Sequence, residues 1–241
     1  MKGDPAGADI TPVLVTYNSA AILPWSLPSL AECRRIIVVD NHSGDDTAAV
    51  ARRALPQVEV IEAGRNLGFG RANNLGLAAV KTRYALLLNP DARLEPGALQ
   101  ALHEAARRYP EAAIVAPVLF DAPGVVGDFF RGPFYAPASR PAPEPEGDLC
   151  AEFVTGAAML LDVQRLRAVG GFDPWFFLYF EDDDLCLRVR RAGHAIVVAH
   201  AARVLHRVRR SSAPSVRSTL RRYSCMTLSK LYLTRKVLGL R

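Results

Sequence analysis

Short apolar runs alternate with segments of helical periodicity along the N-terminal part of the chain. The runs predicted to form buried strands span residues 10–17, 35–40, 58–63 and 84–89. Between them, residues 27–33, 46–55 and 70–81 place apolar side chains at helical intervals and predict helices. Uninterrupted apolar strands are typical of parallel sheets that are covered on both faces. The order therefore predicts an α/β fold, with a doubly wound, mostly parallel sheet and helices on both faces.

The pattern changes in the middle of the chain. A helix is predicted at residues 97–110 and a strand at 112–120, but residues 121–150 hold six prolines and show no strong periodicity. Such a segment is typical of a long surface loop. The remaining predictions are a strand at 157–162 and helices at 163–170 and 183–193.

Polar residues stand at the ends of the predicted strands, where open sheets of this class bind their ligands. These residues are Thr16, Tyr17, Asn18, Asp40, Asn41, Asn89 and Asp91. For Asp40 a second interpretation stays open, in which it and Ser43 only satisfy the backbone of a turn. Residues 64–76 form a loop rich in glycine and asparagine that contains Arg65 and leads into a helix. A loop of this kind can receive a phosphate group.

The length of 241 residues suits one large domain. No apolar run reaches the roughly 18 residues that a membrane-spanning helix requires, and the N-terminus lacks the apolar core of a signal peptide. We therefore expect a cytoplasmic protein. The four cysteines are widely spaced without a C-x-x-C pair, which argues against a zinc site and against a disulfide framework.

Charge divides the chain into two unequal parts. Residues 1–184 hold all 24 acidic residues and 16 of the 30 basic ones, a net charge of −8, whereas residues 185–241 hold the other 14 basic residues and no acid. A basic segment attracts phosphate, which nucleic acids, anionic lipids and phosphorylated ligands all carry. Charge alone does not choose among these partners.

The basic C-terminal segment also has helical periodicity. From Val216 onward its apolar residues recur at three- and four-residue steps, as in a basic amphipathic helix. Either this helix packs back on the domain, or it contacts an anionic membrane, where each basic residue contributes on the order of 1 kcal/mol. We expect a domain at residues 1–207 and a basic amphipathic helical tail at residues 208–241.

Six motifs, taken in order, resemble those of the family-2 glycosyltransferases. They read VTYN, VVDNHSGD, RNLGFGRANNLG, LLLNPDA, GGFDPWFFLYFEDDDLCLR and VLHR, and the resemblance covers residues 10–207. Each motif is weak by itself, but six in this order with βα spacing are specific. The resemblance is strongest to the rhamnosyltransferase-like branch, which builds bacterial cell-surface polysaccharides.

The resemblance implies the GT-A fold and an inverting transfer. A sugar, with rhamnose as a candidate, moves from a nucleoside diphosphate donor to a hydroxyl of a glycan or lipid-linked acceptor. By the same resemblance Tyr17 and Asp40 hold the nucleotide base, and Arg65, Asn66 and Asn74 line the nucleoside diphosphate pocket. The other residues expected to bind the donor are Thr16, Asn18 and Asn89.

A divalent cation, Mg2+ or Mn2+, is the cofactor that the resemblance implies. Asp91 stands where the D-x-D carboxylate of the family binds metal, but the motif here is NPD, so Asn89 replaces the first carboxylate. His206 stands where many relatives place a histidine on the metal or the diphosphate. A structural role for His206 stays open, and His200 competes for the same position.

The four acidic residues 181–184 follow the apolar run PWFFLYF. An inverting transfer needs a base on the far side of the anomeric carbon. By resemblance to the ED motif of the family, Asp182 is that base and Glu181 lies beside it. Asp183 and Asp184 are expected to start a helix, where acids interact favourably with the helix dipole. The alternative is that all four acids form a solvated helix start.

Two other functions stay open. A nucleotidyltransferase shares the sheet, but it normally has a glycine-rich loop with a basic residue after the first strand, where this chain reads TYNSAAILP. A nucleic-acid-binding protein would use the basic tail and would leave Asp91 and the acidic cluster unexplained. We therefore expect a transferase without nucleic acid among its partners, peripheral at the inner face of the membrane. Residues 121–156, which show no readable pattern, are expected to select the sugar.

Overall fold

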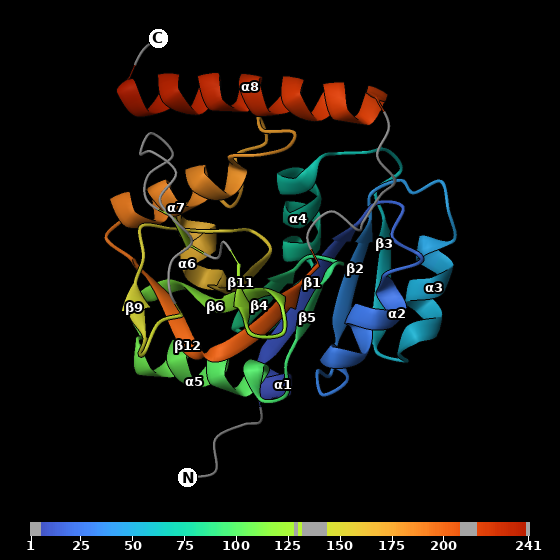
Figure 1. Ribbon diagram of the computed structural model, residues 1–241, viewed down its shortest axis with the longest axis horizontal. Helices are drawn as coiled ribbons and strands as arrows, with labels where there is room; N and C mark the ends of the chain where they lie inside the picture. Colours follow the sequence, from blue (N-terminus) through green and yellow to red (C-terminus); the bar gives the residue numbers. More distant parts are fainter. Residues whose placement is uncertain (1–5, 128–129, 132–143, 208–215, 240–241) are drawn as a thin grey trace.

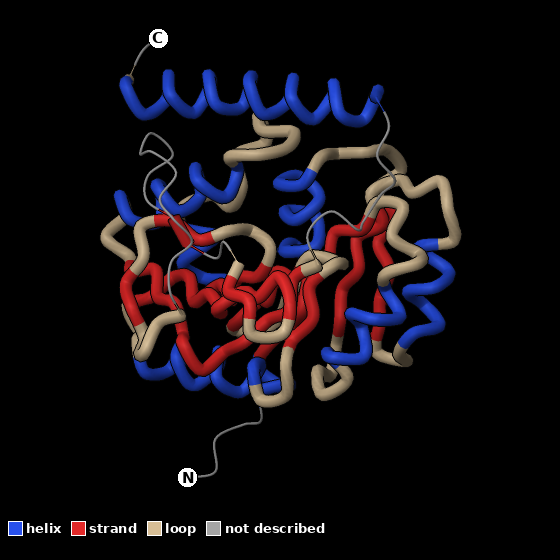
Figure 2. The backbone as a smooth tube through the Cα atoms, in the orientation of Figure 1, coloured by secondary structure: helices blue, strands red, loops and turns tan. Residues whose placement is uncertain are grey.

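The computed structural model describes residues 6–127, 130–131, 144–207 and 216–239. Within them one ten-stranded sheet crosses the molecule, and helices lie above and below it in Figure 1. Figure 2 shows the strands gathered in the middle and most helices at the periphery. The main strand order is β3-β2-β1-β4-β11-β6-β12-β5.

The N-terminal half of the sheet confirms the predicted parallel strands. They are β1 (Ile10–Thr16), β2 (Ile36–Asp40), β3 (Val58–Glu62) and β4 (Tyr84–Leu88). β1 pairs in parallel with both β2 and β4, and β2 pairs in parallel with β3. Their carboxyl ends consequently lie along one edge of the sheet, as the sequence predicts.

Helices α3 (Thr47–Ala54) and α4 (Phe69–Ala78) connect these strands. α4 packs on β1 and β2 at Gly76. A Cβ atom at that position would lie 2.5 Å from Cγ1 of Val13. The glycine thus allows the helix to approach the sheet closely, which fixes the loop that precedes α4.

The other half of the sheet is mixed. β11 (Ala158–Asp162) lies antiparallel between β4 and β6 (Ala112–Ala122). β12 (Ala195–His206) pairs in parallel with β6, and its last residues pair antiparallel with β5 (Ala92–Leu94). The sequence pattern assigned neither β12 nor β5. β12 contains polar residues and a register break after Ala199, which interrupt its apolar pattern, and β5 has only three residues.

The helix predicted at residues 27–33 is confirmed only over residues 27–30, where it is a 3-10 helix. The chain forms α2 (Leu23–Ser26) and then the 3-10 helix η1 (Leu27–Leu30). A proline stands in the first turn of each, at Pro24 and Pro28. Because proline lacks the backbone N–H and fits the start of a helix, the pair favours two short helical pieces over one longer helix.

The loop predicted at residues 121–150 is partly strand. Its residues 128–129 and 132–143 lie outside the described residues. In the remainder, β6 continues to Ala122, and short strands follow. They are β7 (Val125–Val126), β8 (Phe130–Arg131) and β9 (Leu149–Cys150), with β10 (Phe153–Val154) just beyond the predicted loop. β7 and β9 extend the main sheet, whereas β8 and β10 form a separate pair.

The remaining helices are α1 (Ala6–Asp9), α5 (Ala98–Arg108), α6 (Val163–Ala168), α7 (Glu181–Arg191) and α8 (Val216–Leu238). α5 lies below the sheet in Figure 1, whereas α6 and α7 lie above it, and α8 runs across the top of the molecule. The predicted helical cover on both faces is confirmed. None of the described helices is long and apolar enough to cross a membrane.

Candidate active site

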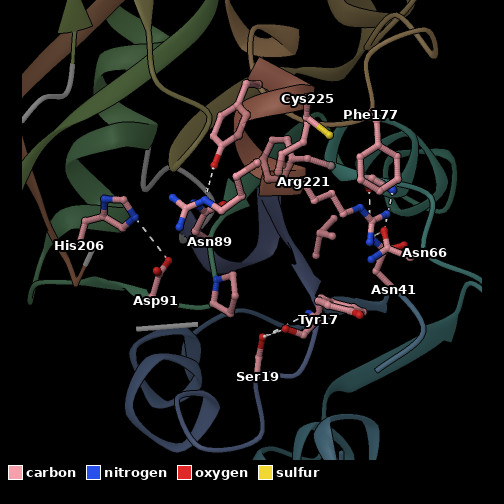
Figure 3. A pocket seen from close by; sticks show the side chains of 17 residues that line it. Tyr17, Ser19, Asn41, Asn66, Asn89, Asp91, Phe177, His206, Arg221 and Cys225 are labelled. Atoms are coloured by element: carbon pink, nitrogen blue, oxygen red, sulfur yellow. Dashed lines mark hydrogen bonds and ion pairs between the residues drawn. The ribbon is translucent and has the colours of Figure 1, made fainter. Parts of the chain in front are cut away.

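A cavity of about 580 Å³ opens where β1, β2 and β4 end. Its walls come from the segments after these strands, from the loop before α7, from His206 at the end of β12 and from α8. In Figure 3, Tyr17 and Ser19 lie below the cavity, Arg221 and Cys225 above it, and Asp91 with His206 to one side. The lining includes five residues to which the sequence assigned a role, and also Asn41, which it placed at a strand end without a role; the five are Tyr17, Asn66, Asn89, Asp91 and His206.

The segment after β1 presents an exposed aromatic ring. Tyr17 is 42% exposed although it faces this cavity, and the side chain of Ser19 contacts its backbone N–H at 3.2 Å. Asn18 adopts φ of 51°, and its side-chain oxygen accepts a hydrogen bond from the Gly44 amide at 2.7 Å. Thr16 is buried and donates its hydroxyl to the Val39 carbonyl. Thr16 and Asn18 therefore hold the turn on which Tyr17 is presented.

Asp40 supports the neighbouring turn. It is 7% exposed, and its carboxylate accepts hydrogen bonds from the hydroxyl of Ser43 at 2.5 Å and from the Ser43 amide at 3.2 Å. These contacts match the turn interpretation of the sequence. Asp40 itself does not line the cavity, but the next residue, Asn41, does. The interpretation that Asp40 holds the nucleotide base therefore stays a prediction.

Asn41 organises the end wall of the cavity that Figure 3 shows beside Asn66. Its side-chain oxygen accepts from the Leu67 amide at 2.7 Å, and its amide donates to Oδ1 of Asn66 at 3.2 Å and to the Gly68 carbonyl at 3.1 Å. Gly68 has φ of 83°, and a Cβ there would lie 2.1 Å from the carbonyl oxygen of Phe177. The glycine therefore lets this loop contact the segment before α7. Asn41 was singled out at the end of its strand without an assigned role.

Asp91 and His206 face one another on the opposite side. Nε2 of His206 lies 3.4 Å from Oδ1 of Asp91, and both side chains are largely buried. The pairing of β5 with β12 places His206 opposite Ala92, and the Arg207 amide donates to the Asp91 carbonyl at 2.8 Å. The two side chains are thus brought together by strand pairing between distant parts of the chain.

His200 occupies a different place. Its Nδ1 lies 2.9 Å from Oδ1 of Asp148, and its backbone amide donates to the same oxygen. Burial by itself raises the pKa of Asp148, but the hydrogen bonds from His200 outweigh it, so the pKa lies below its ordinary value. Of the two candidate histidines, His206 is the one that lines the cavity.

Two of the residues predicted around the nucleoside diphosphate lie outside the cavity lining. Arg65 is exposed on the loop before α4. Asn74 uses its whole amide on Phe172, whose carbonyl accepts from Nδ2 at 2.8 Å and whose N–H donates to Oδ1 at 2.9 Å. The side chain of Asn74 thus ties α4 to the segment that leads to α7, and its role at the nucleoside diphosphate stays a prediction.

The acidic cluster is not a solvated helix start. α7 begins at Glu181, so all four acids lie in its first turn, where Glu181, Asp183 and Asp184 are buried and Asp182 is half-buried. Asp184 is fully buried between Nε of Arg188 at 2.7 Å and Nζ of Lys236 at 2.6 Å. Both oxygens of Asp182 accept backbone N–H groups, from Gly156 at 2.9 Å and from Asp183 at 3.0 Å.

Asp182 lies close to Phe69, which lines the cavity. A Cβ atom on Gly156 would lie 3.1 Å from Cε1 of Phe69 and 3.5 Å from Cβ of Asp182, so the three residues are immediate neighbours. Neither Glu181 nor Asp182 is among the lining residues.

The segment before α7 is held in a strained conformation. Tyr179 and Phe180 have φ of 70° and 65°, which costs about 1–3 kcal/mol each. α8 supports this segment: the hydroxyl of Ser229 donates to the Leu178 carbonyl at 3.0 Å, and Nε of Arg222 donates to the Tyr179 hydroxyl at 2.8 Å. These contacts from α8 help to hold the two residues in their left-handed conformation.

A second group of contacts anchors α8 near its C-terminal end. The ring of Tyr232 stacks on Trp175 at 3.8 Å between centroids, and Nζ of Lys236 contacts Oδ2 of Asp173 at 2.7 Å. Burial alone raises the pKa of Asp173, but the charge and hydrogen bond of Lys236, the Trp175 amide and the Tyr232 hydroxyl together outweigh it, so the pKa is lowered. One face of α8 therefore packs on the domain, which is one of the two alternatives that the sequence left open. The division at residue 207 stays a prediction.

The sequence missed several residues of the cavity. Arg221, Arg222 and Cys225 reach it from α8, and Phe177, Leu178 and Tyr179 reach it from the segment before α7. The apolar run PWFFLYF was a signal for the second group. The periodicity of the tail predicted the helix of the first group, but it did not reveal which face turns inward.

Comparisons with known proteins agree with this architecture. Residues 12–145 match the family described as glycosyl transferase family 2. The chain is 30% identical to N-acetylglucosaminyl-diphospho-decaprenol L-rhamnosyltransferase of Mycobacterium tuberculosis, over 82% of this chain and 76% of that protein. It is 29% identical to a rhamnosyltransferase of Escherichia coli, over 60% of this chain and 63% of that protein.

Two solved structures resemble the fold. A mannosyltransferase of Pyrobaculum calidifontis, in complex with GDP-Man and Mn2+, matches 84% of this chain with a TM-score of 0.62 and 16% identity. GalNAc-T7 with UDP, GalNAc and Mn2+ matches 82% with a TM-score of 0.65 and 13% identity. The chain spans 57% and 43% of these structures, respectively, and at such identities the likeness shows the fold alone. The chain therefore belongs to glycosyl transferase family 2 and has the GT-A fold.

Proposed function

We propose that the protein is an inverting glycosyltransferase of cell-surface polysaccharide synthesis. It transfers a sugar, with rhamnose as our first choice, from a nucleoside diphosphate donor to a hydroxyl of a lipid-linked glycan acceptor. The observation that carries this proposal is the cavity, which has Tyr17 and the Asn41–Asn66 pair in its wall and the Asp91–His206 pair at one side. Family membership favours it over nucleotidyl transfer and over nucleic-acid binding, and the names of the relatives support rhamnose and the lipid-linked acceptor.

The donor site in this proposal uses the strand ends. The ring of Tyr17 packs against the nucleotide base, because an exposed aromatic face in a cavity offers apolar area for stacking. Asn66 and Asn89 supply polar groups along the nucleoside diphosphate, and Thr16, Asn18 and Asp40 hold the turns behind them. Arg65, exposed on the loop before α4, adds a positive charge.

Asp91 and His206 suit a divalent cation. One carboxylate and one imidazole facing the same cavity are common ligands of Mn2+, and phosphate oxygens of a substrate often complete the coordination of Mg2+. Among the described residues there is no group of three or more His, Cys, Asp or Glu that could hold a metal. The pair therefore fits a cation shared with the donor: when bound, it would neutralise charge on the leaving diphosphate.

Asp182 is the proposed base, and Glu181 lies beside it. Asp182 takes the proton of the acceptor hydroxyl. The oxygen of that hydroxyl bonds to the anomeric carbon, on the side opposite the diphosphate, whose bond to that carbon breaks. Backbone N–H groups on both oxygens of Asp182 favour its ionised form and fix its orientation. Glu181 is buried next to Gly70 and supports the start of α7.

A thermal-shift screen tests the donor part of this proposal. The full chain is melted with UDP-, GDP- and dTDP-sugars, each with and without Mn2+. We expect one nucleotide to raise the melting temperature most, and more with metal, because a ligand at 100 times its dissociation constant stabilises a protein by about 2.7 kcal/mol. Free Mn2+ and the sugars without nucleotide are the controls. Equal melting temperatures under all conditions would contradict a nucleotide-sugar donor.

We also propose that α8 rests on the inner face of a membrane. Its outward face is apolar, since Leu220, Tyr223 and Leu231 are each more than 60% exposed. Lys230 and Arg235 flank these residues, and the whole helix contains no acid. An anionic bilayer fits such a surface, because it accepts apolar side chains and attracts the basic ones.

Vesicle flotation tests the membrane contact. We expect the full chain to float with anionic vesicles and much less with neutral ones at moderate salt. Leu220→Ser/Leu231→Ser should lose flotation, because each leucine gives up about 1.5–3 kcal/mol of apolar burial. Val125→Ser is the matched control, since Val125 is also exposed but lies outside α8. Flotation of the double variant at the wild-type level would contradict the assignment of this face.

A further inference from the structure

We propose that Arg221 and Arg222 of α8 form a phosphate-binding pair of the active-site cavity, taking a diphosphate group of a substrate. The inference rests on the proposed function only for the identity of that substrate. It assigns to the C-terminal helix a part of the binding site, in addition to its packing and its membrane-facing surface.

Position is the first argument. Both arginines line the cavity, and so does Cys225, one helical turn further along α8. The next turn is anchored by the hydrogen bond from Ser229 to the Leu178 carbonyl. In Figure 3 the side chain of Arg221 lies on the opposite side of the cavity from Tyr17 and Ser19. The anchored helix therefore holds two guanidinium groups over the cavity.

The hydrogen-bonding state of the two guanidinium groups is the second argument. Arg221 lies over the ring of Phe177 at 4.7 Å, a contact that leaves the N–H groups at its edge available. Within the part of the chain that the structure describes, Arg222 donates only its Nε, to the Tyr179 hydroxyl. Among the described residues neither arginine has a carboxylate partner. Each is thus held by an aromatic side chain while it keeps donors for a ligand.

The acids near α8 are already paired with other cations. Lys236 contacts both Asp173 and Asp184, and Arg188 contacts Asp184 as well. Asp173 and Asp184 therefore have charge partners other than the two arginines. Among the described residues that line the cavity, Asp91 is the single carboxylate, so an anionic ligand would balance the excess positive charge.

Phosphate is the ligand that suits this pair. Planar guanidinium groups bind phosphate oxygens through two parallel hydrogen bonds, and two adjacent groups can hold a diphosphate. The diphosphate can belong to the nucleotide donor or to a lipid-linked acceptor that arrives past α8. Both sources offer the same chemistry to the arginines, and separate probes distinguish them.

Calorimetry with inorganic pyrophosphate, without divalent metal, tests the pair in the full chain. We expect Arg221→Gln/Arg222→Gln to bind pyrophosphate about 10- to 100-fold more weakly than the wild type, because charged hydrogen bonds are lost. Lys230→Gln/Arg235→Gln is the matched control: it removes two exposed charges of α8 that do not line the cavity. An equal loss in both double variants, or no loss in the first, would overturn the assignment.

Tyr179→Phe separates binding from loop positioning. The variant removes the hydroxyl that accepts a hydrogen bond from Arg222 but keeps both arginine charges. Pyrophosphate affinity should therefore stay within about threefold of the wild type, a smaller change than the loss of one charged hydrogen bond would cause. A loss as large as that of the arginine variant would show that Arg222 acts through the loop, and would overturn its role as a ligand.

Two further probes identify the source of the phosphate. UDP, GDP and dTDP represent the donor, and farnesyl diphosphate represents a lipid diphosphate. A loss of affinity in Arg221→Gln/Arg222→Gln for one class assigns the pair to that substrate, and unchanged affinity for both overturns the inference. None of these measurements requires sugar transfer, so a wild type that binds pyrophosphate but no nucleotide sugar would refute the proposed function and leave the pair standing.

Discussion

Asp182→Asn is expected to abolish sugar transfer while the affinity for the donor stays nearly unchanged. General-base catalysis contributes typically about 10²–10⁴-fold to a rate, and an amide cannot take the proton of the acceptor hydroxyl. Donor affinity should persist because Asp182 is not among the residues that line the cavity. The comparison needs kcat with a saturating acceptor and calorimetry with the donor, since a base acts in the transition state and not in donor binding.

Glu181→Gln is the matched control for this experiment. It changes the neighbouring carboxylate in the same helical turn, and it should retain much more turnover than Asp182→Asn. Thermal melting of both variants checks the backbone contacts, because the asparagine loses one of the two acceptors that Gly156 and Asp183 use. Full turnover in a folded Asp182→Asn enzyme would remove this residue from the mechanism.

Asp91→Ala is expected to abolish the part of donor affinity that depends on metal. Mutating a residue that only hydrogen-bonds to a metal ligand typically lowers metal affinity by about 10–100-fold. Removing a direct ligand, as proposed for Asp91, should lower it at least as much. Calorimetry with the nucleotide sugar should therefore show wild-type and variant to differ strongly with Mn2+ and little without it. The dependence on metal separates loss of a ligand from general damage to the cavity.

His200→Ala controls for the removal of a histidine–carboxylate contact near β12. His200 pairs with Asp148 and lies outside the cavity lining, so its loss should leave the Mn2+ effect intact. His206→Ala should resemble Asp91→Ala, since its ring lies 3.4 Å from that carboxylate. An Asp91→Ala protein with wild-type donor affinity in Mn2+ would refute the role of Asp91 as a metal ligand.

The sequence determined the parallel half of the sheet and the edge that carries the site. Strands β1 to β4 are continuous apolar runs, and such runs can be identified from neighbouring residues alone. Since parallel strands end at one edge of the sheet, Tyr17, Asn89 and Asp91 could be placed together before the structure was known. The motifs in that order also indicated the family, and the match over residues 12–145 confirms it.

Contacts between distant segments decided the rest. His206 meets Asp91 only because β12 pairs with β5, and neither strand has a clear local pattern. In the sequence, Asn74 is a polar residue near a loop that could bind phosphate. In the structure, its side-chain amide forms two hydrogen bonds with the backbone of Phe172. Local periodicity carries no information on the partner of a side chain, which is why these two residues could not be distinguished by sequence.

For the acidic cluster and α8 as well, the local sequence does not reveal the partners of the side chains. Four adjacent acids are typical of a solvated helix start, and Asp184 is buried only because Arg188 and Lys236 supply the opposite charges. The tail sequence determined an amphipathic basic helix. Only the tertiary structure decided that Arg221 and Arg222 line the cavity while Leu220 and Leu231 are exposed. The rotation of the helix about its axis depends on its contacts with the domain, which are the Trp175–Tyr232 stack and the ion pairs of Lys236.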